Sequence, residues 1–391
     1  MKKVGIASCI YQDNYGSMLQ AYATQSIISK LGFKGEFIDY RDLNGVKIRK
    51  RFFFFRQIIN YEYVKNKIPM LIYRVCLKFS LTEAAKQIKS RFVSFDRFRK
   101  KYFEVSPRFF SLKSLSDYVT ENYSVVMVGS DQLWLPANVA AGFYTLGFVP
   151  NGIKKASFAT SIGQSYIPES QKKQYREFLK DYNFVSVREK KGAELLFDLT
   201  DKQIEVISDP VFALTRKEWF KLADTDGDFE DKYVLCYFLG KHAKDIRNIK
   251  RFCETNGLRM VLISNIERVC KEERVADNVL YSTSPEEFLN LIRHADYVCT
   301  DSFHCSAFSI IFGTKFIPFM KYRKSDRYST NGRLFELLED FGIKSSVMDD
   351  NTEDINLRVC NAQENVEQIL DRKKLDAEAY LRRILQDDKS S

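Results

Sequence analysis

The sequence has no Gly-x-Gly-x-x-Gly segment, although it opens with the strand–helix–strand pattern that usually carries one. We expect a strand over residues 3–9, a helix over 17–32 that ends in glycine, and a strand over 35–40. In dinucleotide-binding proteins the glycines of this segment let the backbone approach the pyrophosphate of the cofactor. Their absence here argues against binding of NAD or FAD. The opening therefore predicts an α/β fold without a dinucleotide cofactor.

Cysteine pairs with the spacing of a metal site are also lacking. The eight cysteines are scattered, and none stands in a Cys-x-x-Cys segment. This spacing argues against a disulfide scaffold and against a zinc site. We expect reduced, buried thiols in a cytoplasmic protein, no metal and no bound cofactor.

Long apolar runs are absent as well. No run approaches the ~18 residues that a membrane-spanning helix needs. Lys2 and Lys3 lead directly into a strand-like segment, so we expect no secretory signal. The composition predicts a soluble protein in the cytoplasm, or one attached peripherally to the inner membrane face.

Acidic residues are scarce in one segment, residues 46–103. It holds sixteen Lys and Arg but only three Asp and Glu, whereas the rest of the chain is slightly acidic, so the net charge of +10 arises here. Aromatic residues are interleaved with the cations, which predicts two or three basic amphipathic helices. One interpretation is attachment to an anionic membrane or a polyanionic acceptor; the other is a helical hairpin packed on its own domain. No nucleic-acid motif accompanies the charge, so we do not expect nucleic acid as a partner.

At 391 residues the chain is long enough for two domains. Alternating strand and helix patterns predict an α/β fold class with two α/β domains and a cleft between them. We place the first domain at residues 1–212, with the basic insert at 46–103, and the second at 213–345. The remaining residues, 346–391, form a helical tail that we expect to pack back on the first domain.

Histidine is scarce, and of the three histidines His304 has the most functional setting. An apolar strand over residues 297–299 precedes it, and an apolar helix over 306–312, ended by Gly313, follows it. His304 is thus expected at the carboxyl end of a parallel strand, near a helix N-terminus, where α/β folds bind ligands and where anions are favoured. It suits a general acid or base; the alternative is a histidine that packs within a turn. We interpret His242 and His294 as structural.

Several polar and basic residues also follow expected strands. A set of residues that could bind an anion together comprises Arg188, Ser302, Lys321, Arg323 and Lys324. Taken singly, each of the basic ones is more typical of a solvated surface. Asp131 and Trp134 follow a buried strand and suit a sugar, although a tryptophan is as often part of the core. The loop 14–17 precedes a helix and suits a phosphate or hydroxyl groups.

These segments together resemble the polysaccharide pyruvyl transferase family over most of the chain, apart from the insert and the tail. The resemblance is carried, in chain order, by residues 14–23, 128–134, 156–163, 186–190, 208–211 and 300–304 with Gly313.

The resemblance implies two Rossmann-like domains in a GT-B-like arrangement. It implies transfer of a pyruvyl group from phosphoenolpyruvate, as a co-substrate, to two hydroxyls of a glycan sugar, forming a ketal. His304 matches the family histidine and Arg188 a donor-binding arginine. Many members have Arg-Leu-His where this chain has Ser302, Phe303 and His304. Lys321, Arg323 or Lys324 would then supply the missing positive charge.

The resulting expectations form three groups. His304 is the expected catalytic residue. The donor-binding residues are expected to be Arg188, Ser302, Phe303, Lys321 and Lys324. The acceptor-binding residues are expected to be Asn14, Tyr15, Gln20, Asp131 and Trp134. Asp131 is also our candidate for the base that assists the sugar hydroxyl.

Three functions remain open from the sequence. The first is pyruvyl transfer to a sugar, free or lipid-linked, in capsule, exopolysaccharide or wall-glycan assembly. The second is a GT-B glycosyltransferase that uses a nucleotide sugar. The third is a non-catalytic relative that binds a glycan or a membrane surface.

Overall fold

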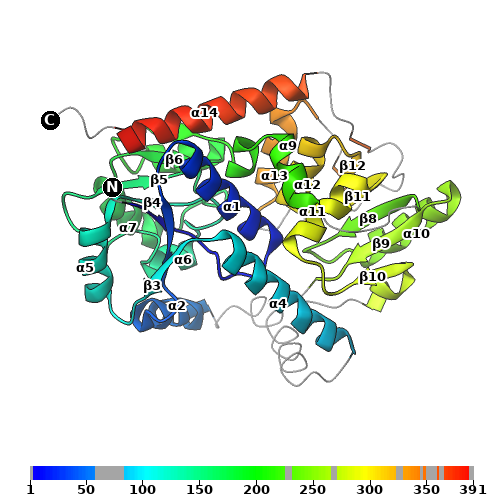
Figure 1. Ribbon diagram of the computed structural model, residues 1–391, viewed down its shortest axis with the longest axis horizontal. Coiled ribbons are helices and arrows are strands. Elements are labelled where there is room, and N and C mark those ends of the chain that lie inside the picture. Colours follow the sequence, from blue (N-terminus) through cyan, green and yellow to red (C-terminus); the bar gives the residue numbers. More distant parts are fainter. Residues whose placement is uncertain are drawn as a thin grey trace. The chain divides into compact units, whose positions relative to one another are not determined.

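The computed structural model describes residues 3–57, 83–224, 231–265, 271–322, 329–343, 347–348, 359–360 and 365–386. Its contacts divide the chain into two units, each of which is described by itself (Figure 1). The first unit comprises Met1–Asn60, Arg99–Leu214 and Leu370–Ser391, and the second comprises Tyr61–Phe98 and Thr215–Ile369.

The first unit contains a five-stranded sheet in the order β3-β2-β1-β4-β5, and every pairing is parallel. The strands are β1 Lys3–Ala7, β2 Gly35–Asp39, β3 Val105–Arg108, β4 Tyr123–Val128 and β5 Lys154–Ser157. The chain moves outward from β1 in one direction through β2 and β3, then crosses to the other side of β1 to form β4. The topological switch point therefore lies between β1 and β4, and ligands bind outside the carboxyl ends of strands at such a point.

Two further parallel strands, β6 Val185–Val187 and β7 Ile204–Val206, form a small sheet in this unit. Strand β7 ends at Val206, and the chain does not continue as a strand: Asp209 accepts from the backbone N–H of Val211, and Pro210 starts a 3₁₀ turn. The helices of this unit are α1 Tyr15–Lys30, α2 Asn44–Gln57, α5 Leu112–Asn122, α6 Pro136–Ala141, α7 Glu169–Lys180, α8 Lys190–Phe197 and the 3₁₀ helix η1 Pro210–Ala213.

The long terminal helix α14, Val366–Gln386, lies against the first unit from Leu370 onward. The buried Tyr380 hydroxyl donates to the carbonyl of Ser157 at the end of β5 (2.9 Å). Lys373 donates to the Ser208 hydroxyl at 2.9 Å. These contacts fasten the C-terminal helix to the sheet-end region of the first unit.

The second unit repeats the same topology with the order β10-β9-β8-β11-β12, again with parallel pairings throughout. Its strands are β8 Tyr233–Tyr237, β9 Arg259–Ile263, β10 Asn278–Leu280, β11 Tyr297–Thr300 and β12 Phe316–Pro318. The switch point here lies between β8 and β11. The helices are α9 Arg216–Ala223, α10 Ala243–Asn256, α11 Pro285–His294, α12 Phe303–Phe312, α13 Gly332–Asp340 and the 3₁₀ helix η2 Lys271–Val275.

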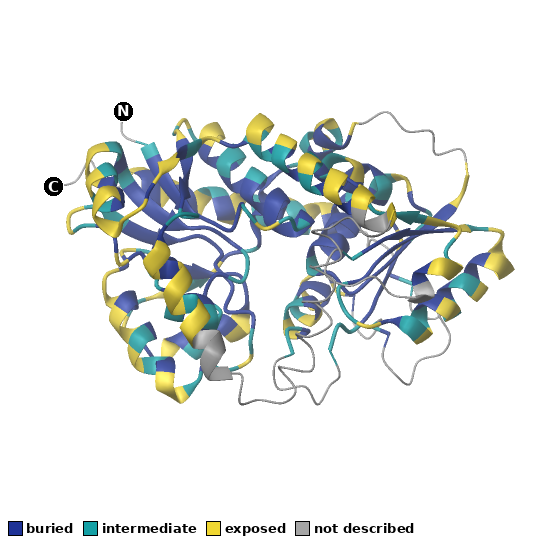
Figure 2. Ribbon diagram, turned by 90° about the horizontal axis from the view of Figure 1, so that it is seen from below, coloured by how far each residue is buried: buried dark blue, intermediate teal, exposed yellow. Residues whose placement is uncertain are grey.

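In each unit the central strands are buried and the outward faces of the helices are exposed (Figure 2). The central strands β4 and β8 are near-continuous apolar runs, as is typical of parallel strands that are covered on both faces. The register pairs Cys299 directly with Cys236 in the second sheet. The six cysteines in the described ranges are all free and buried.

The basic insert is described in two helices, α2 and α4 Glu83–Tyr102, while residues 58–82 lie outside the described part. The division between the units falls inside α4, after Phe98. One face of α4 is buried at helical spacing. It includes Arg91, which donates to the carbonyl of Ser264 in the second unit at 2.7 Å.

Candidate functional site

The candidate residues gather where each sheet has its switch point. In the first unit they lie beyond the carboxyl ends of β1 and β4, and in the second beyond those of β8 and β11. This is the position at which parallel α/β sheets bind ligands. Each unit therefore contributes one cluster of polar side chains.

Asp131 is the centre of the first cluster. Its backbone has a φ of 78°, in the left-handed region that a non-glycine residue rarely adopts. Its carboxylate accepts from the Ser17 hydroxyl (2.5 Å), the Cys9 thiol (3.4 Å) and the backbone N–H of Gln132 (2.8 Å). Burial, with the nearby Asp131 charge, raises the pKa of Cys9, so this thiol is a neutral donor. The loops after β1 and β4 are thus joined through one carboxylate.

Arg188, at the end of β6, lies beside this carboxylate, 4.0 Å from Asp131 Oδ1. It is buried and forms an ion pair with the fully buried Asp209, which also accepts from the Ser130 hydroxyl. Burial alone would lower the pKa of Arg188, but the charges of Asp209, Glu189 and Asp131 outweigh it and raise the pKa. Arg188 is therefore a permanent cation in a carboxylate-rich surrounding.

Three expected acceptor residues lie in the loop and helix after β1. Asn14 caps α1, with its side chain accepting from the N–H of Ser17 (3.2 Å). Gln20 is buried and donates to the Ser17 carbonyl (2.9 Å) and the Ser8 hydroxyl (3.2 Å). Tyr15 is buried as well. In this conformation Asn14 and Gln20 support the turn that presents Ser17 to Asp131.

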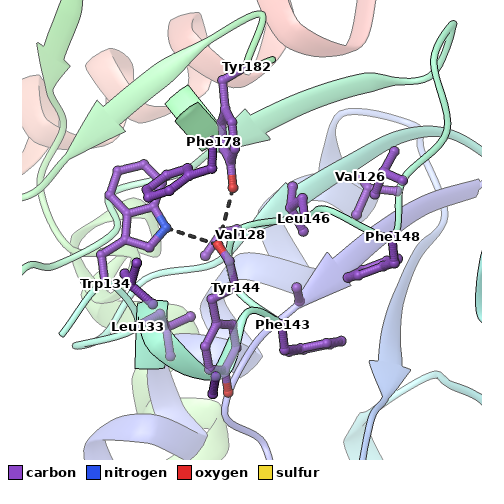
Figure 3. Close-up of a cluster of buried hydrophobic side chains, with 14 of the residues drawn as sticks. Val126, Val128, Leu133, Trp134, Phe143, Tyr144, Leu146, Phe148, Phe178 and Tyr182 are labelled. Atoms are coloured by element: carbon purple, nitrogen blue, oxygen red, sulfur yellow. Dashed lines mark hydrogen bonds between the residues drawn. The ribbon is translucent and has the colours of Figure 1, made fainter. Parts of the chain in front are cut away.

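Trp134 lies in the hydrophobic core and not at a surface (Figure 3). Its indole N–H donates to the carbonyl of Tyr144 at 3.0 Å, and its ring packs against Phe178 and Tyr182. Since the ring is fully enclosed, we assign Trp134 to packing and leave it out of the acceptor site. It holds the loop after Asp131 in place.

His304 is the centre of the second cluster. The helix was expected to start at residue 306, but α12 begins at Phe303, so His304 stands in its first turn. Ser302 is the N-cap, its hydroxyl accepting from the N–H of Cys305 at 3.4 Å. The Phe303 ring meets the His304 ring edge-on, with centroids 5.1 Å apart. Both the helix N-terminus and the strand end thus converge on a buried imidazole.

Asp301 was not singled out by the sequence, but it connects the two strand ends. Its carboxylate accepts from the backbone N–H groups of Leu239 and Gly240, both at 2.7 Å. His242 Nε2 lies 3.0 Å from the same carboxylate, and Nδ1 lies 2.7 Å from Asp245. The sequence signal was available: an Asp directly after one strand, and a His just after its neighbour.

The cationic residues expected near the donor are only partly placed. The Lys321 backbone lies at the Gly240 turn, because a Cβ on Gly240 would stand 2.8 Å from the Lys321 carbonyl oxygen. Arg323 and Lys324 lie outside the described residues. A basic residue that sequence reasoning missed is Arg333 of α13, whose guanidinium carbon lies 5.9 Å from the Phe303 ring centroid. Among the described residues, no group of three or more His, Cys, Asp and Glu side chains could hold a metal ion.

A family model described as "Polysaccharide pyruvyl transferase" matches residues 14–320, which is most of the chain. No curated protein matches the chain in sequence. Among solved structures, a putative UDP-N-acetylglucosamine 2-epimerase from Listeria monocytogenes aligns with a TM-score of 0.51 and 11% identity, over 97% of this chain and 91% of that one. MurG from Acinetobacter baumannii aligns with a TM-score of 0.46 and 8% identity, over 99% and 100%.

The alignment with the Listeria monocytogenes structure concerns the fold alone. Together with the two parallel sheets, it confirms the predicted fold class, two Rossmann-like α/β domains of the GT-B type. The predicted cleft between the domains and the predicted domain boundaries stay predictions. No described helix is long and apolar enough to cross a bilayer.

Proposed function

Because the chain belongs to the polysaccharide pyruvyl transferase family, we propose that it transfers a pyruvyl group from phosphoenolpyruvate to two hydroxyls of one glycan sugar. The product is a cyclic ketal, and inorganic phosphate is released. We further propose that the acceptor is a sugar of a capsule, exopolysaccharide or wall glycan. The observation that carries the proposal is His304 in the first turn of α12, beside the switch point of its sheet.

The reaction requires a proton donor. A sugar hydroxyl adds to C2 of phosphoenolpyruvate as C3 accepts a proton and becomes a methyl group. The second hydroxyl then takes the place of phosphate at C2, and its proton leaves with the phosphate. A histidine beside the donor is suited to deliver the C3 proton or to assist the departure of phosphate. We assign that role to His304.

The donor carries a phosphate and a carboxylate, so its site must favour anions. The N-terminus of α12, directly after β11, offers backbone N–H groups and the positive end of the helix dipole. Arg333 brings positive charge to this region, with its guanidinium carbon 5.9 Å from the Phe303 ring centroid, and the backbone of Lys321 lies at the nearby Gly240 turn. Ser302 caps the helix there, so a cation at another position must replace the arginine that many family members have.

The acceptor hydroxyl requires a base, and Asp131 suits this role. Its carboxylate is held by three neutral hydrogen-bond donors, and its side chain is 16% exposed. Arg188 nearby is buried and already faces several carboxylates, so we assign it to holding Asp131 and Asp209 in place rather than to gripping the donor. Asn14 and Gln20 support the acceptor side from α1.

The test is an assay of phosphate release from phosphoenolpyruvate in the presence of candidate glycans or lipid-linked sugars, followed by mass spectrometry of the acceptor. We expect phosphate release that depends on the acceptor, and a pyruvyl adduct on one sugar. Phosphate release without an adduct, or an adduct formed only from a nucleotide sugar, would contradict the proposal. The glycosyltransferase and the non-catalytic interpretations are not favoured by the family match.

The helix α2 supports a second proposal, attachment to an anionic membrane. Arg49 and Lys50 anchor it to the first unit by donating to the Ala141 carbonyl and the Asn138 side chain, both at 2.9 Å. On α2, Ile48 and Phe52 are 63% and 56% exposed, one helical turn apart. Lys47 and Arg51 are exposed beside them. Apolar side chains flanked by cations are typical of a helix that lies in a membrane interface.

Co-sedimentation with vesicles tests this attachment. We expect binding to vesicles that contain an anionic phospholipid, weakened by salt, and lost in an Ile48→Ser/Phe52→Ser double variant. Phe197→Ser is the matched control, because Phe197 of α8 is 74% exposed but does not belong to the insert. Equal binding of all three proteins would refute the attachment through α2.

A further inference from the structure

Asp301 connects the loop after β8 to the start of α12, and His304 lies in the first turn of that helix. It directly follows β11 and stands three residues before His304. One carboxylate oxygen accepts from the N–H of Leu239, and the other from the N–H of Gly240 and from His242. The Asp301 side chain is completely buried. The position of the first turn of α12 therefore depends on the hydrogen bonds that Asp301 forms with Leu239, Gly240 and His242.

His242 lies between two carboxylates. Its Nδ1 faces Asp245 in the first turn of α10, and its Nε2 faces Asp301 beyond β11. Its ring stacks on Phe238, with centroids 4.5 Å apart, and meets Phe319 of the segment after β12 at 5.8 Å. Among the described residues, the charged side chains that lie within hydrogen-bond distance of this ring are thus Asp245 and Asp301.

The charge of His242 follows from these contacts. Burial alone would lower the pKa of the ring, but the hydrogen bonds with Asp245 and Asp301 outweigh it and raise the pKa to about 9. A protonated imidazole donates from both nitrogens, whereas a neutral one donates from one only. Only the imidazolium can therefore satisfy both carboxylates at once.

The packing leaves little freedom for another arrangement. A Cβ on Gly240 would lie 2.8 Å from the Lys321 carbonyl oxygen, 2.9 Å from Asp301 Oδ2 and 3.1 Å from His242 Nε2. The strand-end loops after β8, β11 and β12 thus meet at one glycine. A displacement of His242 is transmitted to Asp301 and so to the turn that carries His304.

We infer that His242, in its protonated form, is a positioning residue that holds the His304 turn in the geometry for pyruvyl transfer. This inference rests on the proposed function and adds a residue to it. His242 does not act as the proton donor, because both ring nitrogens are engaged by carboxylates and its side chain is buried. Loss of its proton releases one carboxylate and loosens the link between β8 and β11.

The first experiment measures kcat and KM for phosphoenolpyruvate between pH 6 and 10 in the wild type, His242→Gln and Asp245→Asn. We expect kcat to fall on the alkaline side near pH 9 in the wild type. In Asp245→Asn this limb moves to lower pH by about one unit or more, because one of the two stabilising charges is removed. In His242→Gln, kcat falls about 10- to 100-fold at pH 7, since a displaced catalytic group loses rate steeply.

His294→Gln is the matched control, because His294 is exposed at the end of α11 and bonds to its own helix at the Asn290 carbonyl. We expect it to leave kcat and the alkaline limb as in the wild type. An unshifted limb in Asp245→Asn, or a kcat in His242→Gln within twofold of the wild type, would overturn the inference. Asp245 is partly exposed, so its variant tests the inference even if His242→Gln fails to fold.

A second measurement needs no activity and separates this inference from the proposed function. The chain has three histidines, so the ring resonances of a histidine-labelled protein are few enough to assign by NMR. We expect the His242 ring to titrate near pH 9, and the His304 resonances to shift over the same range in the wild type but not in His242→Gln. If the His304 resonances do not shift over the pH range in which His242 titrates, the coupling between His242 and His304 is refuted. A wild type inactive with phosphoenolpyruvate would refute only the proposed function.

Discussion

At each of the two switch points of this protein, an aspartate connects the loops after two neighbouring strands. The two aspartates differ in their hydrogen-bond partners and in their exposure to solvent. In the first unit, Asp131 joins the loops after β1 and β4; in the second, Asp301 joins those after β8 and β11. Asp131 accepts from a hydroxyl, a thiol and one N–H, and its side chain is 16% exposed. Asp301 accepts from two N–H groups and faces an imidazolium, and its side chain is 0% exposed.

The difference separates a reactive carboxylate from a structural one. A buried carboxylate that is fully occupied by donors and a cation has no means of taking a proton from a substrate. Asp131 has Arg188 4.0 Å from its Oδ1, but its hydrogen-bond donors are neutral and its side chain is still partly open, so it keeps that capacity. In the proposed function the reactive group of the second unit is therefore His304, three residues beyond Asp301, and that of the first unit is Asp131 itself.

The largest expected effect comes from His304→Asn. Removing the proposed proton donor should lower kcat for phosphate release by about 10²- to 10⁴-fold. The reason is that an amide cannot deliver the proton to C3. The measurement is single-turnover phosphate release with the purified variant, with thermal melting to show that it remains folded. A rate within tenfold of the wild type would contradict the catalytic assignment.

The next effect distinguishes the two aspartates by stability. Asp301→Asn retains one acceptor where two backbone N–H groups and His242 converge, so we expect a loss of about 3–5 kcal/mol of unfolding free energy. Asp131→Asn should cost about 1 kcal/mol, because its donors are a rotatable hydroxyl, a thiol and one N–H. Urea unfolding of both variants measures the difference. Equal losses of unfolding free energy in the two variants would show that Asp131 and Asp301 contribute equally to stability.

The same pair is then compared by activity. Asp131→Asn should lower kcat about 10²-fold while leaving the melting temperature nearly unchanged, since it removes a base but little packing. Asp131→Glu keeps a carboxylate but places it one methylene farther from the backbone. Its kcat should lie between those of Asp131→Asn and the wild type. A full rate in Asp131→Asn at saturating acceptor would remove this residue from the chemistry.

A smaller effect is the pH dependence of stability that arises from His242. Its pKa is raised from 6.5 to about 9 in the folded state, so the imidazolium stabilises the fold. This contribution is fully present below about pH 6.5, declines as pH rises, and is lost above about pH 9. Its upper limit is about 3 kcal/mol. Urea unfolding from pH 6 to 10 should show that the free energy of unfolding of the wild type declines with pH, and that this decline is absent in His242→Gln. If the free energies of the two proteins change with pH in parallel, His242 does not contribute to the pH dependence.

The smallest effect concerns the hydroxyl that holds Asp131. Ser17→Ala removes the 2.5 Å hydrogen bond while Cys9 and Gln132 remain as donors. We expect a loss of about 1 kcal/mol in stability and a reduction in kcat of about tenfold or less. Ser17→Thr keeps the hydroxyl and is the matched control. A larger fall in rate than in Asp131→Asn would place Ser17, not Asp131, at the acceptor.

Much of the organisation was readable in the sequence because it depends on local pattern. The strand and helix around His304 and the buried apolar runs follow from residue type and spacing. The edge strands β3 and β10 and the helix α5 were missed. Edge strands are short and only half buried, so they lack a clear hydrophobic period.

The sequence by itself determined the two α/β units, the strand-end position of His304 and the family to which its segments point. Only the tertiary structure decided which side chains meet. It buried Trp134 in the core, surrounded Arg188 with carboxylates and placed His242 between the carboxylates of Asp245 and Asp301. These outcomes depend on contacts between residues far apart in the chain, such as His242 with Asp301, and no local period encodes such a pairing.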